Sequence, residues 1–144
     1  KIVFRLGDVN TEIKNIEKNS YDVIMCLGFF YHTIEHWKIL SEIKRINPKY
    51  LILDTNISTL NNDVIEIYFE YPKHEANAYF QQTNSESVLV GKPSRFALEL
   101  MLKKLDFDIK FIDWNTLGIQ NWKHIVEYYK GERITLLATN TLKE

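Results

Sequence analysis

The chain has 144 residues, of which 45% are hydrophobic and 13% aromatic, enough to bury the core of one globular domain. Its formal net charge of -1 gives no basic field for nucleic acid or an anionic membrane, so charge does not support a nucleic-acid partner. No apolar run approaches the roughly 20 residues that span a bilayer, and no signal-peptide pattern opens the chain. Cys26 is the single cysteine, so an internal disulfide is excluded. Together these features predict a cytoplasmic protein with no membrane partner.

The chain opens on Lys1 and not on methionine, and residues 2–6 (IVFRL) are rich in apolar side chains. We expect residues 2–6 to form a first strand that ends at Gly7 and Asp8, because both residues favour turns over sheet interiors. This opening predicts that residues 1–144 are a single-domain fragment of a longer protein.

The most informative stretch is residues 21–32, YDVIMCLGFFYH. Its five consecutive apolar residues, 23–27, predict a strand that is buried on both faces. Ligands of open α/β sheets bind at the carboxyl ends of strands. The residues that follow this strand, from Gly28 to His32, are therefore candidates for a functional site.

A helix is predicted after His32, because apolar residues recur with a helical period at Ile34, Trp37, Leu40 and Ile43. Ile39 and Ile46 widen this apolar stripe. Pro48 disfavours helix at the preceding residue, so the helix should end at Asn47. A second continuous apolar run, residues 50–53, follows. Strand, helix and strand in this spacing predict a parallel crossover unit.

Residues 56–92 form an insertion after the second central strand. Within it, residues 64–71 alternate apolar and polar side chains, which predicts a half-exposed strand. The insertion is either a lid or substrate-recognition segment, since loops carry specificity on a rigid scaffold, or an arm that covers the sheet or pairs with another chain.

The clearest helix follows Pro93 and Ser94, with its apolar face at Leu98, Met101, Leu102 and Leu105. Residues 109–114 and 133–139 read as strands with no obvious crossover helix between them, so we expect antiparallel neighbours. The predicted fold class is α/β, with a mostly parallel sheet, an antiparallel C-terminal strand and helices on both faces.

The order of these elements, together with YDVIMCLGFFYH, resembles the C-terminal half of a class I S-adenosylmethionine-dependent methyltransferase with a Rossmann-like fold. Gly7, Asp8, residues 21–32 and residues 51–55 follow that family's Gly-Asp turn, its "(F/Y)DVV…LGVLYH" segment and its "LVLET" segment. Residues 93–107 resemble the "PS..AL..ML...GF" segment of a subgroup that includes the enzymes methylating or carboxymethylating wobble uridine in tRNA.

One position departs from that segment: Asp106 stands where the subgroup has glycine, which argues against a left-handed helix cap there.

The resemblance implies S-adenosylmethionine as the cofactor. By the family pattern, Asp8 accepts a hydrogen bond from the adenine amino group, and Val9 lies beside the adenine ring. Leu27, Gly28 and Phe29 would contact the methionine part, where a glycine lets the backbone approach a ligand closely.

His32 is the candidate catalytic residue, a base or orienting group beside the transferred methyl, with a helix-capping or structural role as the alternative. For Tyr31 two interpretations stay open, a wall of the substrate pocket or a core residue. Residues 32–36 also spell H-x-x-E-H, a zinc-protease pattern. A third ligand is not evident, so we expect no metal site.

The family's glycine-rich turn is missing, because the glycines at 7, 28, 91, 118 and 131 form no G-x-G-x-x-G. The family's strand order is 3-2-1-4-5-7-6, so strands 1 and 2 would lie between residues 2–6 and residues 23–27. We therefore expect residues 2–6 to pair directly with residues 23–27, or a homodimer to form across that edge or through the 56–92 arm.

Two functional hypotheses follow. In the first, the intact parent protein transfers a methyl group to a small molecule, a sugar or an RNA base, while this fragment alone is inactive. In the second, the chain is a non-catalytic, truncated half-domain that self-associates and does not bind the cofactor.

Overall fold

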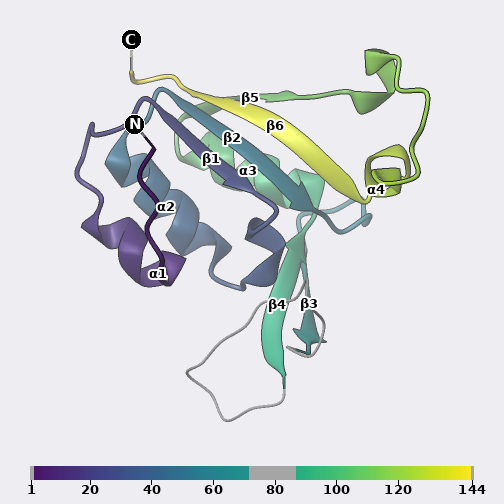
Figure 1. The fold of residues 1–144 in the computed structure, drawn as a ribbon, viewed down its shortest axis with the longest axis horizontal. Helices are drawn as coiled ribbons and strands as arrows, with labels where there is room; N and C mark the ends of the chain where they lie inside the picture. The colour runs from purple at the N-terminus through teal and green to yellow at the C-terminus, as the bar shows by residue number, and fades with distance from the viewer. Residues whose placement is uncertain (1, 72–86, 144) are drawn as a thin grey trace.

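The computed structural model describes residues 2–71 and 87–143, and its centre is a four-stranded sheet (Figure 1). The strand order is β1 (Val23–Leu27), β2 (Tyr50–Asn56), β6 (Arg133–Asn140) and β5 (Phe107–Phe111). β1 and β2 are parallel, whereas β6 runs antiparallel to both β2 and β5. The predicted parallel unit and the predicted antiparallel C-terminal pair are therefore confirmed. The expectation of a mostly parallel sheet was wrong, because among the described strands β6 is antiparallel to both of its neighbours.

The helix between β1 and β2 is α2 (His36–Ile46), and it ends where Pro48 predicts. Asn47 caps it in the left-handed conformation, with φ 61°. Its core face is formed by Ile39, Leu40, Ile43 and Ile46. The prediction was wrong for Ile34, which precedes the helix, and for Trp37, which lies off this face; both are about half exposed, at 47% and 48%.

The predicted helix after Pro93 is α3 (Arg95–Lys104). Ser94 is its N-cap, because the hydroxyl oxygen accepts a hydrogen bond from the Ala97 amide at 3.0 Å. Leu98 and Leu102 are fully buried, as predicted. Just after the helix, Asp106 has φ 57°, so the left-handed conformation is kept without glycine, which aspartate tolerates better than most residues.

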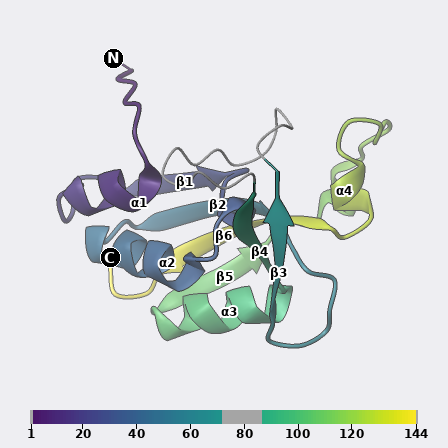
Figure 2. The same ribbon diagram turned by 90° about the horizontal axis from the view of Figure 1, so that it is seen from below.

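The hydrophobic core lies between one face of the sheet and the helices α2 and α3, which pack on the same side of it (Figure 2). Alternate residues of the strands point into this layer, among them Leu51, Leu53, Leu136 and Ala138. Burying one leucine or isoleucine side chain contributes about 1.5–3 kcal/mol, so this layer supplies most of the stability of the fold.

The opposite face of β1 is open. Val23, Met25 and Leu27 are 46%, 60% and 53% exposed, so the prediction of a strand buried on both faces was wrong. Two helical segments contact the neighbouring strands: Trp114 in η3 (Trp114–Leu117) donates a hydrogen bond to Thr135 of β6, and Tyr128 in α4 (Val126–Tyr129) donates one to Asp54 of β2.

Residues 2–6 do not form a strand, and the predicted pairing with β1 is wrong. Their apolar side chains, Ile2, Val3, Phe4 and Leu6, are all exposed. A strand needs a hydrogen-bonding partner, and within residues 2–71 and 87–143 the outer edge of β1 has none. The chain next forms α1 (Val9–Glu12) and η1 (Ile13–Asn15), with Asp8 as the N-cap of α1.

The described part of the insertion is an antiparallel hairpin of β3 (Ile65–Glu70) and β4 (Val88–Pro93), which projects from one end of the sheet (Figure 1). The predicted strand at 64–71 is confirmed as β3. The remainder of the predicted insertion, residues 72–86, lies outside the described residues. No helix in the described ranges is long and apolar enough to cross a membrane.

Candidate functional site

The carboxyl end of β1 turns sharply at Gly28. This residue has φ +69°, in the left-handed region that favours glycine, and its amide donates a hydrogen bond to the Asp54 carbonyl at 2.9 Å. A Cβ atom added there would lie 3.3 Å from Nη2 of Arg133. Both conformation and space therefore favour glycine at the point where the chain leaves the sheet.

A polar cluster, the Asp54 cluster, lies beside this turn and comprises Asp54, Tyr128, Arg133, Thr135 and Trp114. The Arg133 Nε and Nη2 groups donate to Asp54 Oδ1, the former at 2.7 Å, while the Tyr128 hydroxyl, at 2.7 Å, and the Thr135 hydroxyl donate to Oδ2. Trp114 Nε1 in turn donates to the Thr135 hydroxyl oxygen at 3.1 Å. The Asp54 carboxylate thus has hydrogen bonds to both oxygens.

The Asp54 cluster also fixes the protonation of its neighbours. Burial on its own lowers the pKa of Arg133, but the hydrogen bond and charge of Asp54 outweigh burial and raise it. Burial, and then Asp54, raise the pKa of the Tyr128 phenol and bring that of the Cys26 thiol to about 12. In this environment the Cys26 thiol stays protonated at neutral pH and is a poor nucleophile.

A second polar pair joins the sheet to the hairpin. His32, the last residue of η2 (Phe30–His32), has its Nδ1 2.8 Å from Oε2 of Glu70 at the end of β3. Both side chains are about 10% exposed. The Tyr31 ring lies 3.9 Å from the imidazole, centroid to centroid. Burial, and then the charges of Glu70 and Tyr31, raise the pKa of nearby Tyr68 to about 12.

His36, one helical turn further on, contacts the other strand of the hairpin. Its Nε2 donates a hydrogen bond to the Gly91 carbonyl at 3.0 Å, and its ring packs edge-on against Phe30. Burial lowers the pKa of His36 despite that carbonyl. The two histidines of the H-x-x-E-H pattern thus bind different partners, and the described residues bring together no three His, Cys, Asp or Glu side chains that could hold a metal.

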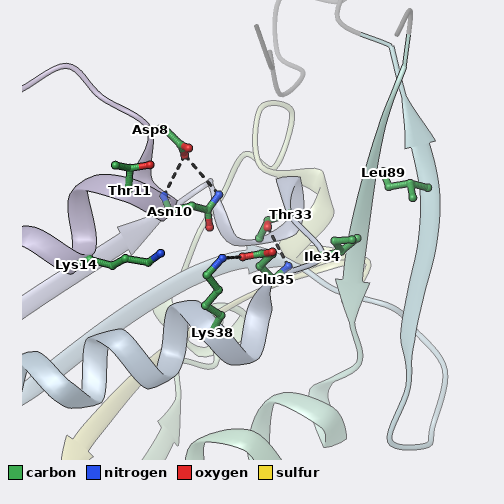
Figure 3. A pocket seen from close by; sticks show the side chains of 9 residues that line it. All are labelled: Asp8, Asn10, Thr11, Lys14, Thr33, Ile34, Glu35, Lys38 and Leu89. Carbon is green, nitrogen blue, oxygen red and sulfur yellow. Dashed lines mark hydrogen bonds and ion pairs between the residues drawn. The ribbon is translucent and has the colours of Figure 1, made fainter. Parts of the chain in front are cut away.

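A polar pocket of about 380 Å³ lies between α1, the start of α2 and β4 (Figure 3). Its lining residues are Asp8, Asn10, Thr11, Lys14, Thr33, Ile34, Glu35, Lys38 and Leu89. Asp8 Oδ1 accepts from the Asn10 amide at 3.0 Å, and Lys38 pairs with Glu35. The Oδ1 atom of Asn10 is buried without a hydrogen-bond partner.

Asp8 is the one predicted cofactor residue among the residues that line this pocket. Thr33, the residue after His32, also lines it. Leu27, Gly28 and Phe29 lie at the end of β1, and Val9, in the first turn of α1, is half-buried. Tyr31 is half-buried beside His32. Sequence reasoning missed Asp54 and Glu70, although an acid at the end of a predicted strand was a visible signal in both cases.

No protein-family model and no curated protein matches this chain. Solved structures with a similar fold include the N-terminal domain of EvdMO1 with SAH bound, at TM-score 0.61 and 20% identity over 94% of this chain. The same domain in the presence of SAH and D-fucose matches equally well. A protein from Listeria monocytogenes, described as an S-adenosylmethionine dependent methyltransferase, matches at TM-score 0.53 and 15% identity over 90% of this chain.

These likenesses show that the chain has the α/β fold of class I S-adenosylmethionine-dependent methyltransferase structures. It spans 52–54% of the EvdMO1 domain and 66% of the Listeria protein, so it corresponds to about half of the EvdMO1 domain.

Proposed function

We propose that the protein containing this chain transfers a methyl group from S-adenosylmethionine to a small, hydroxylated acceptor such as a sugar. The observation that carries the proposal is the β1-β2-β6-β5 sheet, whose fold recurs in a domain crystallised with SAH. That domain was also crystallised in the presence of D-fucose, which supports a sugar over an RNA base. The absence of a G-x-G-x-x-G predicts that this polypeptide alone is inactive.

The polar pocket suits the adenine end of the cofactor. Asp8 and the unpartnered Asn10 Oδ1 both accept hydrogen bonds, and an exocyclic amine offers two donors. Val9 follows Asp8 in the chain and supplies an apolar side chain for the ring. Leu27, Gly28 and Phe29 are proposed for the methionine part, because the half-buried turn at Gly28 has no side chain to keep a ligand from the backbone.

His32 and Tyr31 are proposed for the acceptor side. When bound, S-adenosylmethionine supplies an electrophilic methyl group, and transfer depends mainly on proximity and orientation. A base at His32 assists when the acceptor must lose a proton. Tyr31, packed on the His32 ring, forms a wall of the same site.

Calorimetric titration with SAH tests this proposal. We expect saturable binding below millimolar SAH, weakened at least tenfold in Asp8→Ala and unchanged in Asp108→Ala, an exposed aspartate on β5 at the far edge of the sheet. Absence of binding at millimolar SAH in the folded protein would contradict cofactor binding by this chain.

A second candidate function is self-association without catalysis. It is favoured by the exposed apolar face of β1 and by its outer edge, which pairs with no strand among residues 2–71 and 87–143. An exposed strand edge next to apolar side chains is a site for pairing with another chain. Sedimentation velocity should then show a homodimer, and Met25→Lys should return it to monomer. A dimer that survives Met25→Lys but is lost in Phe69→Lys would assign the contact to the hairpin arm, and a monomeric wild type would exclude this candidate.

A further inference from the structure

We infer that Glu70 is the positioning residue for His32, and that the pair serves acceptors whose hydroxyl proton must be removed. The inference deepens the proposed methyl transfer and rests on it. It starts from one contact: the last strand residue of β3 places a carboxylate against the first functional histidine after β1, 38 residues away in sequence.

The contact fixes which ring nitrogen carries hydrogen. A carboxylate oxygen only accepts hydrogen bonds, so Nδ1, at 2.8 Å from Oε2, must be the donor. In the neutral imidazole the lone pair then lies on Nε2. Because both side chains are about 10% exposed, the charge-assisted bond is shielded from water.

Within the described residues, Glu70 is the acid that forms an ion pair with the imidazole of His32. Titratable groups beside the pair include Tyr31, whose ring is tilted by 38° relative to the imidazole, and Tyr68, on the same strand as Glu70. Tyr68 stays a neutral phenol at physiological pH, since its pKa is raised to about 12. His36 points to Phe30 and Gly91 instead.

The hairpin that carries Glu70 is held at a second point. His36 donates a hydrogen bond to the Gly91 carbonyl of β4, and His32, four residues earlier, binds Glu70 of β3. The two histidines therefore hold both strands of the hairpin. The approach is close: a Cβ on Gly91 would lie 2.9 Å from Cε1 of His36 and 2.9 Å from Cγ2 of Ile65. This packing limits the freedom of the strand that presents Glu70.

The chemistry that follows is a balanced displacement. The acceptor oxygen forms a bond to the methyl carbon as the carbon–sulfur bond breaks, and that electron pair goes to the sulfonium, which becomes a thioether. The hydroxyl proton moves to Nε2 of His32, and the imidazolium is stabilised by Glu70. A carboxylate acceptor needs no such base, so the pair selects alcohol or phenol hydroxyls.

The test is an NMR titration of His32 in the folded chain. We expect the neutral ring to be protonated at Nδ1, and the titration midpoint to fall by about one pH unit in Glu70→Gln, because an adjacent carboxylate favours the imidazolium. Glu70→Asp should restore part of the shift. Glu66→Gln, an exposed glutamate on the same strand, should leave the midpoint unchanged. An Nε2-protonated ring, or equal midpoints in wild type and Glu70→Gln, would overturn the inference.

Methyl transfer by the parent protein gives the second readout. With a panel of sugar and phenol hydroxyls as acceptors, Glu70→Gln should lower kcat about 100-fold with little change in KM. The acid limb of the pH profile of kcat should move together with the NMR titration midpoint of His32. Loss of kcat with an unmoved acid limb would reduce Glu70 to a structural anchor. Failure of SAH binding would instead contradict the proposed function, while the titration would still decide on the pair.

Discussion

Two buried acids, Asp54 and Glu70, flank the carboxyl ends of β1 and β2, and they differ in the side chains that they face. The Asp54 carboxylate has donors on both oxygens from Arg133, Tyr128 and Thr135. The pair of Glu70 and His32 instead joins one carboxylate to one side of an imidazole. The hydrogen bonds of Asp54 join β2 to β6 and α4. The bond of Glu70 uses Nδ1 of His32, so Nε2 is the nitrogen proposed to act as a base.

The comparison teaches that burial of an acid does not by itself mark a functional site. Asp54 and Glu70 are buried to nearly the same extent, at 7% and 8% exposure. What differs is the partner: Asp54 faces a permanently charged guanidinium, whereas Glu70 faces a histidine, the residue type whose charge changes near neutral pH. Substitutions in the two groups should therefore affect different observables.

The largest effect is expected for Asp54→Ala. Removing the carboxylate leaves Arg133 partly buried without its counter-ion, along with the hydroxyls of Tyr128 and Thr135, and should lower the free energy of unfolding by about 3 kcal/mol. Urea denaturation measures this. Asp22→Ala is the control, since Asp22 forms an exposed ion pair with Lys143 and should cost at most about 1 kcal/mol. Equal losses in the two variants would contradict the account.

A smaller loss is expected for Gly91→Ala. The new methyl group meets His36 and Ile65 at 2.9 Å, so either the hairpin or α2 must shift, at about 1–3 kcal/mol. The same denaturation experiment measures the loss, and the His32 titration should move as well, because Glu70 shifts with the hairpin. An unchanged stability would show that the hairpin is not packed on α2.

The smallest expected effect is on the pH dependence of stability. The pKa of His36 is lowered in the folded state, so the unfolded chain binds more protons below pH about 6.5, and stability falls as the pH drops through that window. His36 adds at most about 1.4 kcal/mol per pH unit to this slope. His36→Gln should flatten the slope, whereas His124→Gln, at an exposed site, should not. A slope retained in His36→Gln would contradict the assignment.

Local signals predicted the framework of β1, α2, β2 and α3 because each is encoded by neighbouring residues. The apolar run at 23–27, Pro48 and the Ser94 cap act over a few positions each. Residues 2–6 have a similar composition but form no strand, since a strand also needs a partner. The open face of β1 was missed for the same reason: burial on the second face depends on other elements.

The sequence predicted the residues of the candidate site that follow β1, but not the residue that the hairpin contributes. Gly28 and His32 follow a recognisable strand, whereas Glu70 is brought to His32 by a hairpin whose second strand, β4, gave no clear signal. Alternation in β3 indicated a two-faced strand but not which face would be buried. In the structure Glu70 is buried, while Ile67 and Phe69 are exposed.

The most direct test of the central claim, that this sheet end binds the cofactor, is to titrate the isotope-labelled chain with SAH and follow its amide signals. The account predicts saturable shifts at Asp8, Val9, Gly28 and Phe29, with β5 unaffected. Shifts confined to other parts of the chain, or none at millimolar SAH, would contradict it.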